Sequence, residues 1–491
     1  MLGIVITYYS LAECCTKVDV LDVVQLSDWT ADAIYQAMIG VLKENNVPLH
    51  NWVGFCADTT NVMMGLNNSV SQRVKENFPT VIIVKCSCHS IHLVSSYTCK
   101  KLPSSLEDLV RTIYVHLKRS PKRQKGFEEF QKFFNEEQNP KKILAPGQTR
   151  WLSLQNCVRR ILEYWEALKH YWQLITFEDK THANELTYST LKNPLMKCMM
   201  EFVEYALGLF NDFNTFFQSD APNFSNLKTE VTRLLKTLGL NFMDPKYIRN
   251  TEGLLIDPHA SGYYLPLKSI YLGVMATETL NELCDAEEKE VEKIYKSVKD
   301  FYIESMVQIK KRFEFVTDDH FDDAQFLIPQ NAKNLQPISL QPVAKKYLIH
   351  RTELNFNISR LDSHWREHIF LENTADDLHE YWKGIFKVKE GSKLKYEELS
   401  KCVSLFLALP FSNAVTERLF SSLKIVKSDK RNRLNDETLS SLLCVKHGMK
   451  RTKQDTMYLM ENNVLGKKYV KSNACATSSK QIRLSSSGLV D

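Results

Sequence analysis

Glycine and proline are scarce in this sequence, with 16 glycines and 15 prolines among 491 residues. Because few helix breakers are present, long helices are favoured. No apolar run reaches the roughly 18 residues that a bilayer crossing needs, so no membrane partner is expected. The apolar stretch Leu2–Tyr9 has no basic flank and no small-residue cleavage site. It therefore predicts a strand and not a secretory leader.

The 12 cysteines have no regular spacing and form no compact framework of pairs. Together with the expected lack of a leader, this indicates a reducing intracellular compartment, nuclear or cytoplasmic. The net charge of +5 is mild and permits a nucleic-acid partner without requiring one. Nothing in the pattern points to a small-molecule substrate or to a cofactor. A composition of 44% hydrophobic and 25% charged residues is typical of a folded protein.

The first hundred residues alternate between strand and helix patterns. Apolar runs of strand length occur at Leu2–Tyr9, Val18–Leu26, Trp52–Ala57 and Val81–Cys86. Helical spacing marks Ala31–Leu42, between the second and third of these runs. This order predicts an α/β layer arrangement, a mixed sheet with helices on its faces.

Beyond about residue 105 the pattern is helical. Thr149–Trp172 is expected to form one long helix, and 185–390 shows no convincing strand. This layout predicts an α/β portion interrupted by a large all-helical insertion. The expected division is 1–175 for the first part of the core, 176–394 for the insertion, 395–463 for closing helices with an association region, and 464–491 for a polar, disordered tail.

Asp58 stands at the end of an apolar strand, in the run Gly54-Phe55-Cys56-Ala57-Asp58-Thr59-Thr60. Strand ends in open α/β sheets collect active-site residues, and carboxylates placed there can hold Mg²⁺. Two such ions can flank a phosphodiester. The local alternative is that Asp58 caps the following turn, and the local pattern favours it.

Cys86-Ser87-Cys88-His89 is part of the densest Cys/His cluster. Structural zinc sites draw ligands from two separated pairs, and no second pair follows at finger spacing. A structural block of buried cysteine and hydrogen-bonded histidine, centred on Cys86 and His89, is the commoner arrangement. The alternative is that two or three of these groups share a metal site with a distant partner.

Residues 100–150 contain 12 Lys and Arg against 6 Asp and Glu. Lys122, Arg123 and Arg150 are candidates for phosphate contacts, and Trp151 for stacking on an unpaired base. The alternatives are that the charge run is a solvated face and that Trp151 anchors a core.

Glu417 falls about one turn inside a helix that begins near Ser412 or Asn413. The helix carries an apolar stripe, and a second amphipathic helix starts near Asn435. Periodicity does not distinguish a hairpin packed on its own core from a dimer face. The candidate association residues are Leu419, Phe420, Leu423, Leu439, Leu442 and Leu443.

Four ordered blocks resemble the hAT superfamily of DNA transposases and its host-retained relatives of the zinc-finger MYM-type-like, SCAN-domain-like and BED-type groups. They are GFCADTTNVMMG, KCSCHSIHL, TRWLSL and SNAVTERLFSSLKIVKSDKRNRLNDETLSSLL. The resemblance implies an RNase H-like core with a helical insertion and Mg²⁺-dependent DNA cleavage by an Asp-Asp-Glu triad. Asp58 would be the second acid and Glu417 the third, both as Mg²⁺ ligands. Trp151 would stack a flipped base.

The resemblance also places the family's first Asp on a strand preceding Leu2–Tyr9, so the chain is expected to be N-terminally truncated and to lack both that acid and the BED-type finger. We therefore expect an inactive, homodimeric relative that binds DNA, not an enzyme. Replacing Leu419 and Leu423 with aspartate is expected to give a soluble monomer. The alternatives are an active Mg²⁺-dependent transposase with a further N-terminal segment, and a nuclear interaction scaffold.

Overall fold

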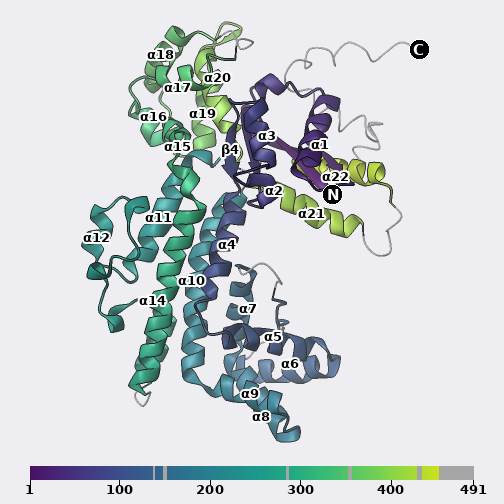
Figure 1. Cartoon of the computed structure of the whole chain (residues 1–491), viewed down its shortest axis with the longest axis vertical. Coiled ribbons are helices and arrows are strands. Elements are labelled where there is room, and N and C mark those ends of the chain that lie inside the picture. Colours follow the sequence, from purple (N-terminus) through teal and green to yellow (C-terminus); the bar gives the residue numbers. More distant parts are fainter. Residues whose placement is uncertain are drawn as a thin grey trace. The chain divides into compact units, whose positions relative to one another are not determined.

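The computed structural model describes residues 1–135, 139–146, 152–219, 221–283, 287–351, 356–427 and 434–452. These residues form a mostly helical protein with a few small sheets (Figure 1). They divide into two compact units, each assembled from segments that are distant in sequence. Unit 1 comprises Met1–His89, Phe217–Lys228 and Phe315–Asp491, and unit 2 comprises Ser90–Phe216 and Thr229–Glu314.

Unit 1 begins with a long β-hairpin. Its two strands pair antiparallel, from Leu2 opposite Val24 to Ser10 opposite Cys15, with one irregularity in register. A parallel pair of short strands follows, with Gly54 opposite Ile82 at its start. The elements in this part are β1 (Leu2–Ser10), β2 (Cys15–Val24), α1 (Ala31–Glu44), β3 (Gly54–Ala57), α2 (Asn61–Met64), α3 (Val70–Asn77) and β4 (Ile82–Lys85). The next helix, α4 (Ser87–Cys99), has its first three residues in unit 1 and the rest in unit 2.

The expected single mixed sheet is wrong. Over the described residues, β1–β2, β3–β4 and β5–β6 form three separate two-stranded sheets. The first two sheets nevertheless share one apolar core, in which Ile4 and Leu21 join Phe55 and Ala57 around α1 and α3. Apolar periodicity reports which face of a strand is buried, but not which strand lies beside it. The strands of both sheets bury apolar residues in the same core, so their sequence pattern resembles that of a single sheet.

The residues that the structure describes in the C-terminal part of unit 1 form helices and one very short hairpin. Its central helix, α20, is buried along the face that carries Leu399, Cys402, Val403 and Phe406. The elements are α15 (Asp319–Asp323), α16 (Pro329–Lys333), α17 (Gln341–Tyr347), α18 (Ile358–Glu367), α19 (Leu378–Phe386), β5 (Lys389–Glu390), β6 (Lys393–Leu394), α20 (Glu397–Leu407), α21 (Ala414–Val426) and α22 (Asp436–Thr452).

Unit 2 contains two helices of 25 residues each, α10 and α14, which run side by side (Figure 1). Phenyl rings pack between them: the centroids of Phe202 and Phe301 are 5.2 Å apart, and those of Phe213 and Phe313, the residue that follows α14, are 5.4 Å apart. The helices are α5 (Ser105–Lys118), α6 (Pro121–Asn135), α7 (Leu152–Glu163), α8 (Trp165–Glu178), α9 (His182–Lys192), α10 (Pro194–Gln218), α11 (Leu227–Leu240), α12 (Pro245–Asn250), α13 (Val274–Glu282) and α14 (Glu288–Arg312).

The expected helix over Thr149–Trp172 is two helices, α7 and α8, which meet at Tyr164. The backbone of Tyr164 leaves the helical region, with φ −112° and ψ 24°, and its ring is fully buried. Across the described part of the chain, no helix is both long enough and apolar enough to span a membrane.

Candidate functional site

Asp58 follows the last residue of β3 and shapes the turn that leads into α2. Its Oδ1 accepts hydrogen bonds from the Thr60 backbone N–H at 3.1 Å and from the Thr60 hydroxyl at 2.6 Å. Such local bonds are the usual reason for an aspartate at the start of a turn. The side chain is half-buried, and its Oδ1 stabilises the turn at the end of the parallel strand pair through these two hydrogen bonds.

Cys86 directly follows β4, and its thiol accepts hydrogen bonds from two segments far apart in sequence. Its backbone N–H donates to the carbonyl of Ala57 at 3.0 Å, which extends the β3–β4 ladder to the residue before Asp58. The Cys86 Sγ accepts from the backbone N–H of His89 at 3.3 Å and from that of Asn413 at 3.1 Å. The first of these bonds caps the start of α4. The second joins β4 to the residue that precedes α21.

Ser87 adds to this connection. Its backbone N–H and its hydroxyl both donate to the carbonyl of Phe411, at 3.1 Å and 2.8 Å. The start of α21 is thereby fastened to the end of β4 by three hydrogen bonds. The expected Cys/His block is thus a helix-capping and docking element, in which His89 takes part through its backbone N–H.

Glu417 lies in the first turn of α21, where its backbone N–H donates to the carbonyl of Asn413 at 2.9 Å. Its half-buried carboxylate influences the pKa of the two thiols that follow β4, those of Cys86 and Cys88. Burial raises the pKa of Cys86 to about 11, and the charge of Glu417 contributes. Burial and the neighbouring charges of Cys86 and Glu417 also raise the pKa of Cys88.

Besides burial, the charge of Asp58 raises the pKa of a third thiol, that of Cys56, which also feels Cys86 and Cys88. Burial raises the pKa of Cys56 well above its ordinary value, and Cys86, Cys88 and Asp58 add to the shift. The structure therefore brings the two predicted acids to one thiol cluster, which we define as Cys56, Cys86 and Cys88. The sequence singled out both acids and Cys86, but Cys56 gave no separate signal.

The surroundings of the two acids fit Mg²⁺ poorly. Mg²⁺ takes hard oxygen ligands, whereas the groups that feel the charge of Asp58 or Glu417 include the neutral, soft thiols of Cys56, Cys86 and Cys88. Within the described ranges, no group of three or more His, Cys, Asp or Glu side chains is placed to share a metal ion. We therefore derive no metal-dependent step from this arrangement.

Replacing Cys86 with alanine is expected to lower the free energy of unfolding by about 0.5–2 kcal/mol, the usual cost of losing a helix cap. The Sγ is the acceptor for both His89 and Asn413. Urea unfolding followed by circular dichroism measures the loss. Cys86→Ser keeps an acceptor and should recover part of the stability, and equal losses in the two variants would contradict the capping role.

The predicted DNA contacts are only partly visible. Arg150 and Trp151 lie outside the described residues. Lys122 and Arg123 are exposed on α6. They belong to a basic corner between α5 and α6, which consists of Lys118, Arg119, Lys122, Arg123 and Lys125.

These five side chains of the basic corner make no ion pair with any residue that the structure describes. The guanidinium group of Arg123 donates a long hydrogen bond, of 3.5 Å, to the carbonyl of His116. Burial, together with the charge of Arg123, lowers the pKa of His116 to about 4. Since exposed cations without carboxylate partners are available to bind phosphate, the corner can contact nucleic acid.

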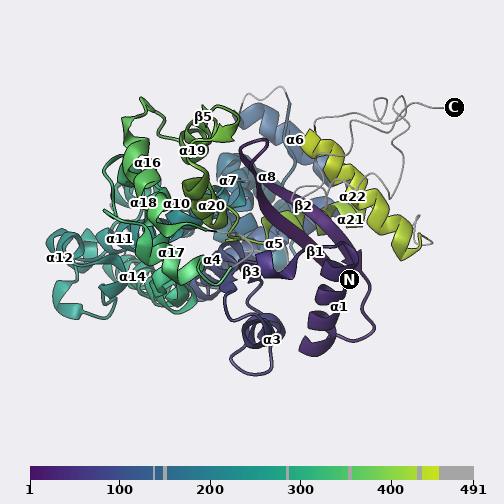
Figure 2. The ribbon, with the colours of Figure 1, turned by 90° about the horizontal axis from the view of Figure 1, so that it is seen from above.

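Three of the predicted association residues are buried within the chain. Leu419, Leu439 and Leu443 are 0% exposed and form an apolar core with Val20 and Val23 of β2. Figure 2 shows α21 and α22 beside the β1–β2 hairpin. Their apolar stripe is therefore covered by the chain's own strands, one of the two arrangements that periodicity left open.

The remaining association candidates differ in exposure. Leu423 is half-buried at the edge of the same core, and the ring of Phe420 approaches β1 at Gly3. Leu442 is 43% exposed, and Ile425 on α21, which the sequence pattern did not single out, is 71% exposed. Among the residues of α21 and α22 whose side chains the structure describes, these two are large apolar groups exposed to solvent.

A comparison with protein families bears on this same region. The family model described as the hAT family C-terminal dimerisation region matches residues 360–449. The matched segment runs from within α18 to within α22 and includes Glu417, the buried leucines, Ile425 and Leu442. This part of the chain is thus similar to the dimerisation region of hAT transposases.

Proposed function

We propose that the chain is a hAT transposase-like protein that forms a homodimer through the solvent side of α21 and α22, holds DNA at its basic corner, and lacks transposase activity. The observation that carries the proposal is the match of residues 360–449 to the hAT dimerisation region. A DNA partner implies that the protein works in the nucleus. The α/β portion would then correspond to an RNase H-like core.

Association through Ile425 and Leu442 is supported by their exposure on α21 and α22. Exposed apolar side chains inside a segment related to a dimerisation region are the natural contacts for a second copy. The buried leucines contribute indirectly, since their packing on β2 holds the two helices in place. In this arrangement the association face is the outer side of the layer and the core is its inner side.

Ile425→Asp combined with Leu442→Asp is expected to give a folded monomer, because a charge on this face opposes association at little cost to the core. Sedimentation velocity of the wild-type chain should show a dimer. The matched control is Ile338→Asp, since Ile338 is 72% exposed in unit 1 outside the matched segment. A wild-type monomer, or a double variant that stays dimeric, would refute the proposed face.

Absence of transposase activity is supported by the interactions and surroundings of Asp58 and Glu417. Asp58 accepts hydrogen bonds from Thr60, and burial keeps the neighbouring thiols of Cys56, Cys86 and Cys88 neutral, so that they are poor ligands for Mg²⁺. An active enzyme with Mg²⁺ is the alternative. Incubation of the chain with supercoiled DNA and Mg²⁺ decides between them, because Mg²⁺-dependent nicking that disappears in Glu417→Gln would overturn the inactive assignment.

Binding to duplex DNA, measured across a range of salt concentrations, tests the remaining part of the proposal. Phosphate contacts release counterions, so affinity should fall linearly in log salt. Replacing Lys122 and Arg123 with glutamine should lower the affinity and flatten the slope. A negligible signal that salt does not change would favour a protein-interaction scaffold instead.

A further inference from the structure

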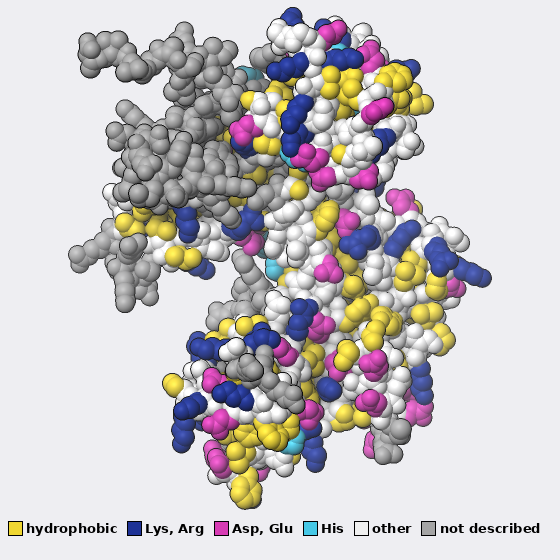
Figure 3. Space-filling model, turned by 180° about the vertical axis from the view of Figure 1, so that it is seen from behind, with side chains coloured by type: hydrophobic (Ala, Val, Ile, Leu, Met, Phe, Trp, Pro, Cys, Tyr) yellow, Lys and Arg dark blue, Asp and Glu magenta, His cyan; other side chains and the backbone are white. Residues whose placement is uncertain are grey.

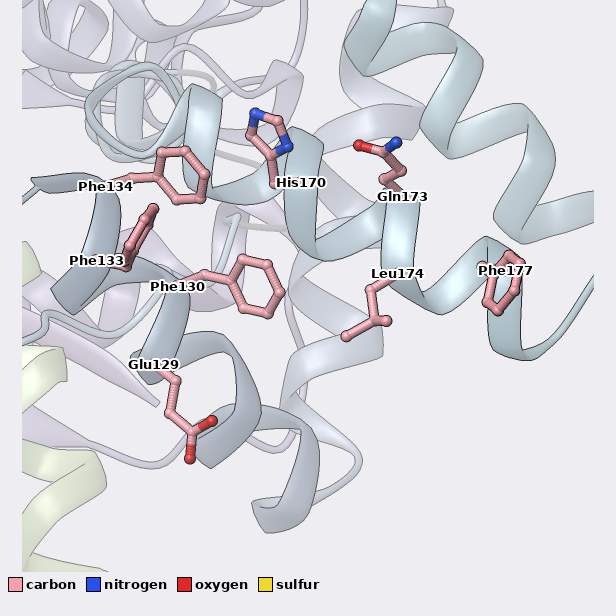
Figure 4. A pocket seen from close by; sticks show the side chains of 8 residues that line it. All are labelled: Glu129, Phe130, Phe133, Phe134, His170, Gln173, Leu174 and Phe177. Carbon is pink, nitrogen blue, oxygen red and sulfur yellow. The ribbon is translucent and has the colours of Figure 1, made fainter.

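An open groove lies between α6 and α8 in unit 2, with a hollow of about 620 Å³. Figure 4 shows that its walls are largely aromatic, with Phe130, Phe133, Phe134 and His170 gathered toward one end and Leu174 and Phe177 toward the other. Hollows of this size accommodate groups such as a nucleotide. We call this the aromatic groove, and it is lined by Glu129, Phe130, Phe133, Phe134, His170, Gln173, Leu174 and Phe177.

The aromatic rings in the groove are unusually open to solvent. Phe133 is 78% exposed and Phe177 is 82% exposed, whereas single-chain folding would favour burying both. Phe134 and His170 stack face to face, with ring centroids 4.6 Å apart and planes at 6°. The stacked pair lies beside exposed Phe133, and exposed Phe177 lies at the other end of the groove, so the groove offers π faces at both ends at little ordering cost.

The same helix carries the groove wall and the basic corner. Lys122 and Phe133 are eleven residues apart, which is three helical turns, so they lie on the same side of α6 about 16 Å apart along its axis. Lys125 lies between them. Figure 3 shows hydrophobic and basic side chains next to one another on the surface formed by α6, α8 and α9. The cations of the corner make no ion pair among the described residues.

We propose that the aromatic groove binds unpaired bases of single-stranded DNA while the basic corner holds the adjoining phosphates. Proteins that bind single strands combine a positively charged track with aromatic side chains on which successive bases stack. Here both parts are presented by α6. The proposal rests on the DNA-binding part of the proposed function and specifies which form of DNA unit 2 binds.

The polar groups of the groove fit bases better than phosphates. The carboxylate of Glu129 repels a phosphate, but it can accept a hydrogen bond from the exocyclic amine of a base. The amide of Gln173 can both donate and accept at a base edge. A groove for an amphipathic protein helix would need apolar side chains for its anchors, but it would not need a cluster of unpaired cations beside it. Charge and ring geometry together favour a nucleic acid.

The test measures the affinity of the full chain for a fluorescently labelled thymidine oligonucleotide by anisotropy. Phe133→Ala combined with Phe177→Ala should weaken binding at least tenfold, because stacking contributes substantially for each base. The salt dependence should stay unchanged, since no charge is removed. Lys122→Gln combined with Lys125→Gln should instead reduce the slope of log affinity against log salt, by roughly 0.7 for each phosphate that the variant no longer neutralises.

Matched controls lie in unit 1. Phe370 is 81% exposed, and Phe370→Ala should leave binding unchanged. Lys43 and Lys75 are exposed on α1 and α3, and their glutamine variants control for loss of net charge. Thermal unfolding should be the same in all of these variants, because every replaced side chain is exposed.

Several results would overturn the proposal. If the double phenylalanine variant binds the single strand as tightly as wild type while duplex binding persists, the groove fails and the proposed function stands. If neither form of DNA binds, the proposed DNA role fails with it. Loss of dimerisation in the phenylalanine variant would mark the groove as a protein contact. Equal or tighter binding of a uridine oligonucleotide would exclude single-stranded DNA as the specific ligand.

Discussion

Leu419→Asp is expected to unfold the α21–α22 layer and not to release a soluble monomer. Leu419 is 0% exposed between α21, α22 and β2. Removing a buried leucine side chain costs about 2–5 kcal/mol, and placing an unpaired carboxylate in the same site costs more. The loss is comparable to the whole stability of many domains, about 5–15 kcal/mol. The monomer expected from the sequence therefore requires substitutions on the other side of the layer.

Guanidinium unfolding followed by circular dichroism checks this expectation. Leu443→Asp, in the same core, should behave like Leu419→Asp. Ile425→Asp is the control on the same helix, and it should stay within about 0.5 kcal/mol of wild type because its side chain is 71% exposed. If Leu419→Asp gave a monomer of wild-type stability, the packing of α21 on β2 would be wrong.

Acid should destabilise unit 1 through one buried histidine. His368 is 1% exposed, and its Nδ1 and Nε2 lie at hydrogen-bond distance from the Trp365 carbonyl and the Tyr381 hydroxyl. A carbonyl only accepts, so Nδ1 carries the proton and Nε2 accepts from Tyr381. Burial outweighs the Trp365 hydrogen bond and lowers the pKa of His368 to about 4.

The direction of the pH effect follows from this lowered pKa. In the unfolded chain a histidine has a pKa of about 6.5, so the unfolded state binds the proton first as the pH falls. The contribution is fully present above about pH 6.5 and is lost as the pH falls toward 4, by about 3 kcal/mol in total. Urea titrations at pH 7, 5.5 and 4 measure the loss.

His368→Gln separates this group from the other titrating residues. A glutamine can donate and accept hydrogen bonds but does not titrate, so the variant should lose less stability than wild type between pH 7 and 4. His350→Gln, at an exposed position of unit 1, should follow the wild-type curve. Parallel curves for wild type and His368→Gln would contradict the role of His368.

Local patterns predicted the elements around the candidate acids but not how those elements are connected. The β3 strand that ends just before Asp58, helix α1 and the helix that carries Glu417 all follow from apolar spacing. The contact between Cys86 and Asn413 does not, because it joins residues 327 positions apart. Spacing also shows that the leucines of α21 must be covered, but it does not show by what. The covering residues are Val20 and Val23 of β2, and their place opposite α21 depends on the tertiary fold.

Tyr164 illustrates the same limit within a single helix pattern. The apolar spacing continues through it, so the sequence predicts an unbroken helix. Its hydroxyl accepts from the Lys141 backbone N–H at 3.4 Å, and its ring packs against Phe127 with centroids 6.2 Å apart. Both contacts come from other segments of unit 2, so the break between α7 and α8 depends on tertiary packing.

The packing of α22 on β2 has a consequence for synthesis. Val23 and Ser440, joined by a hydrogen bond of 3.4 Å, are 417 residues apart. At about 5–20 residues per second, roughly 20–80 s pass between their translation. Throughout that interval the nascent hairpin leaves the ribosome with Val20 and Val23 uncovered. Recovery of native protein should therefore depend on how well chaperones shield this apolar strand until α22 has been synthesised.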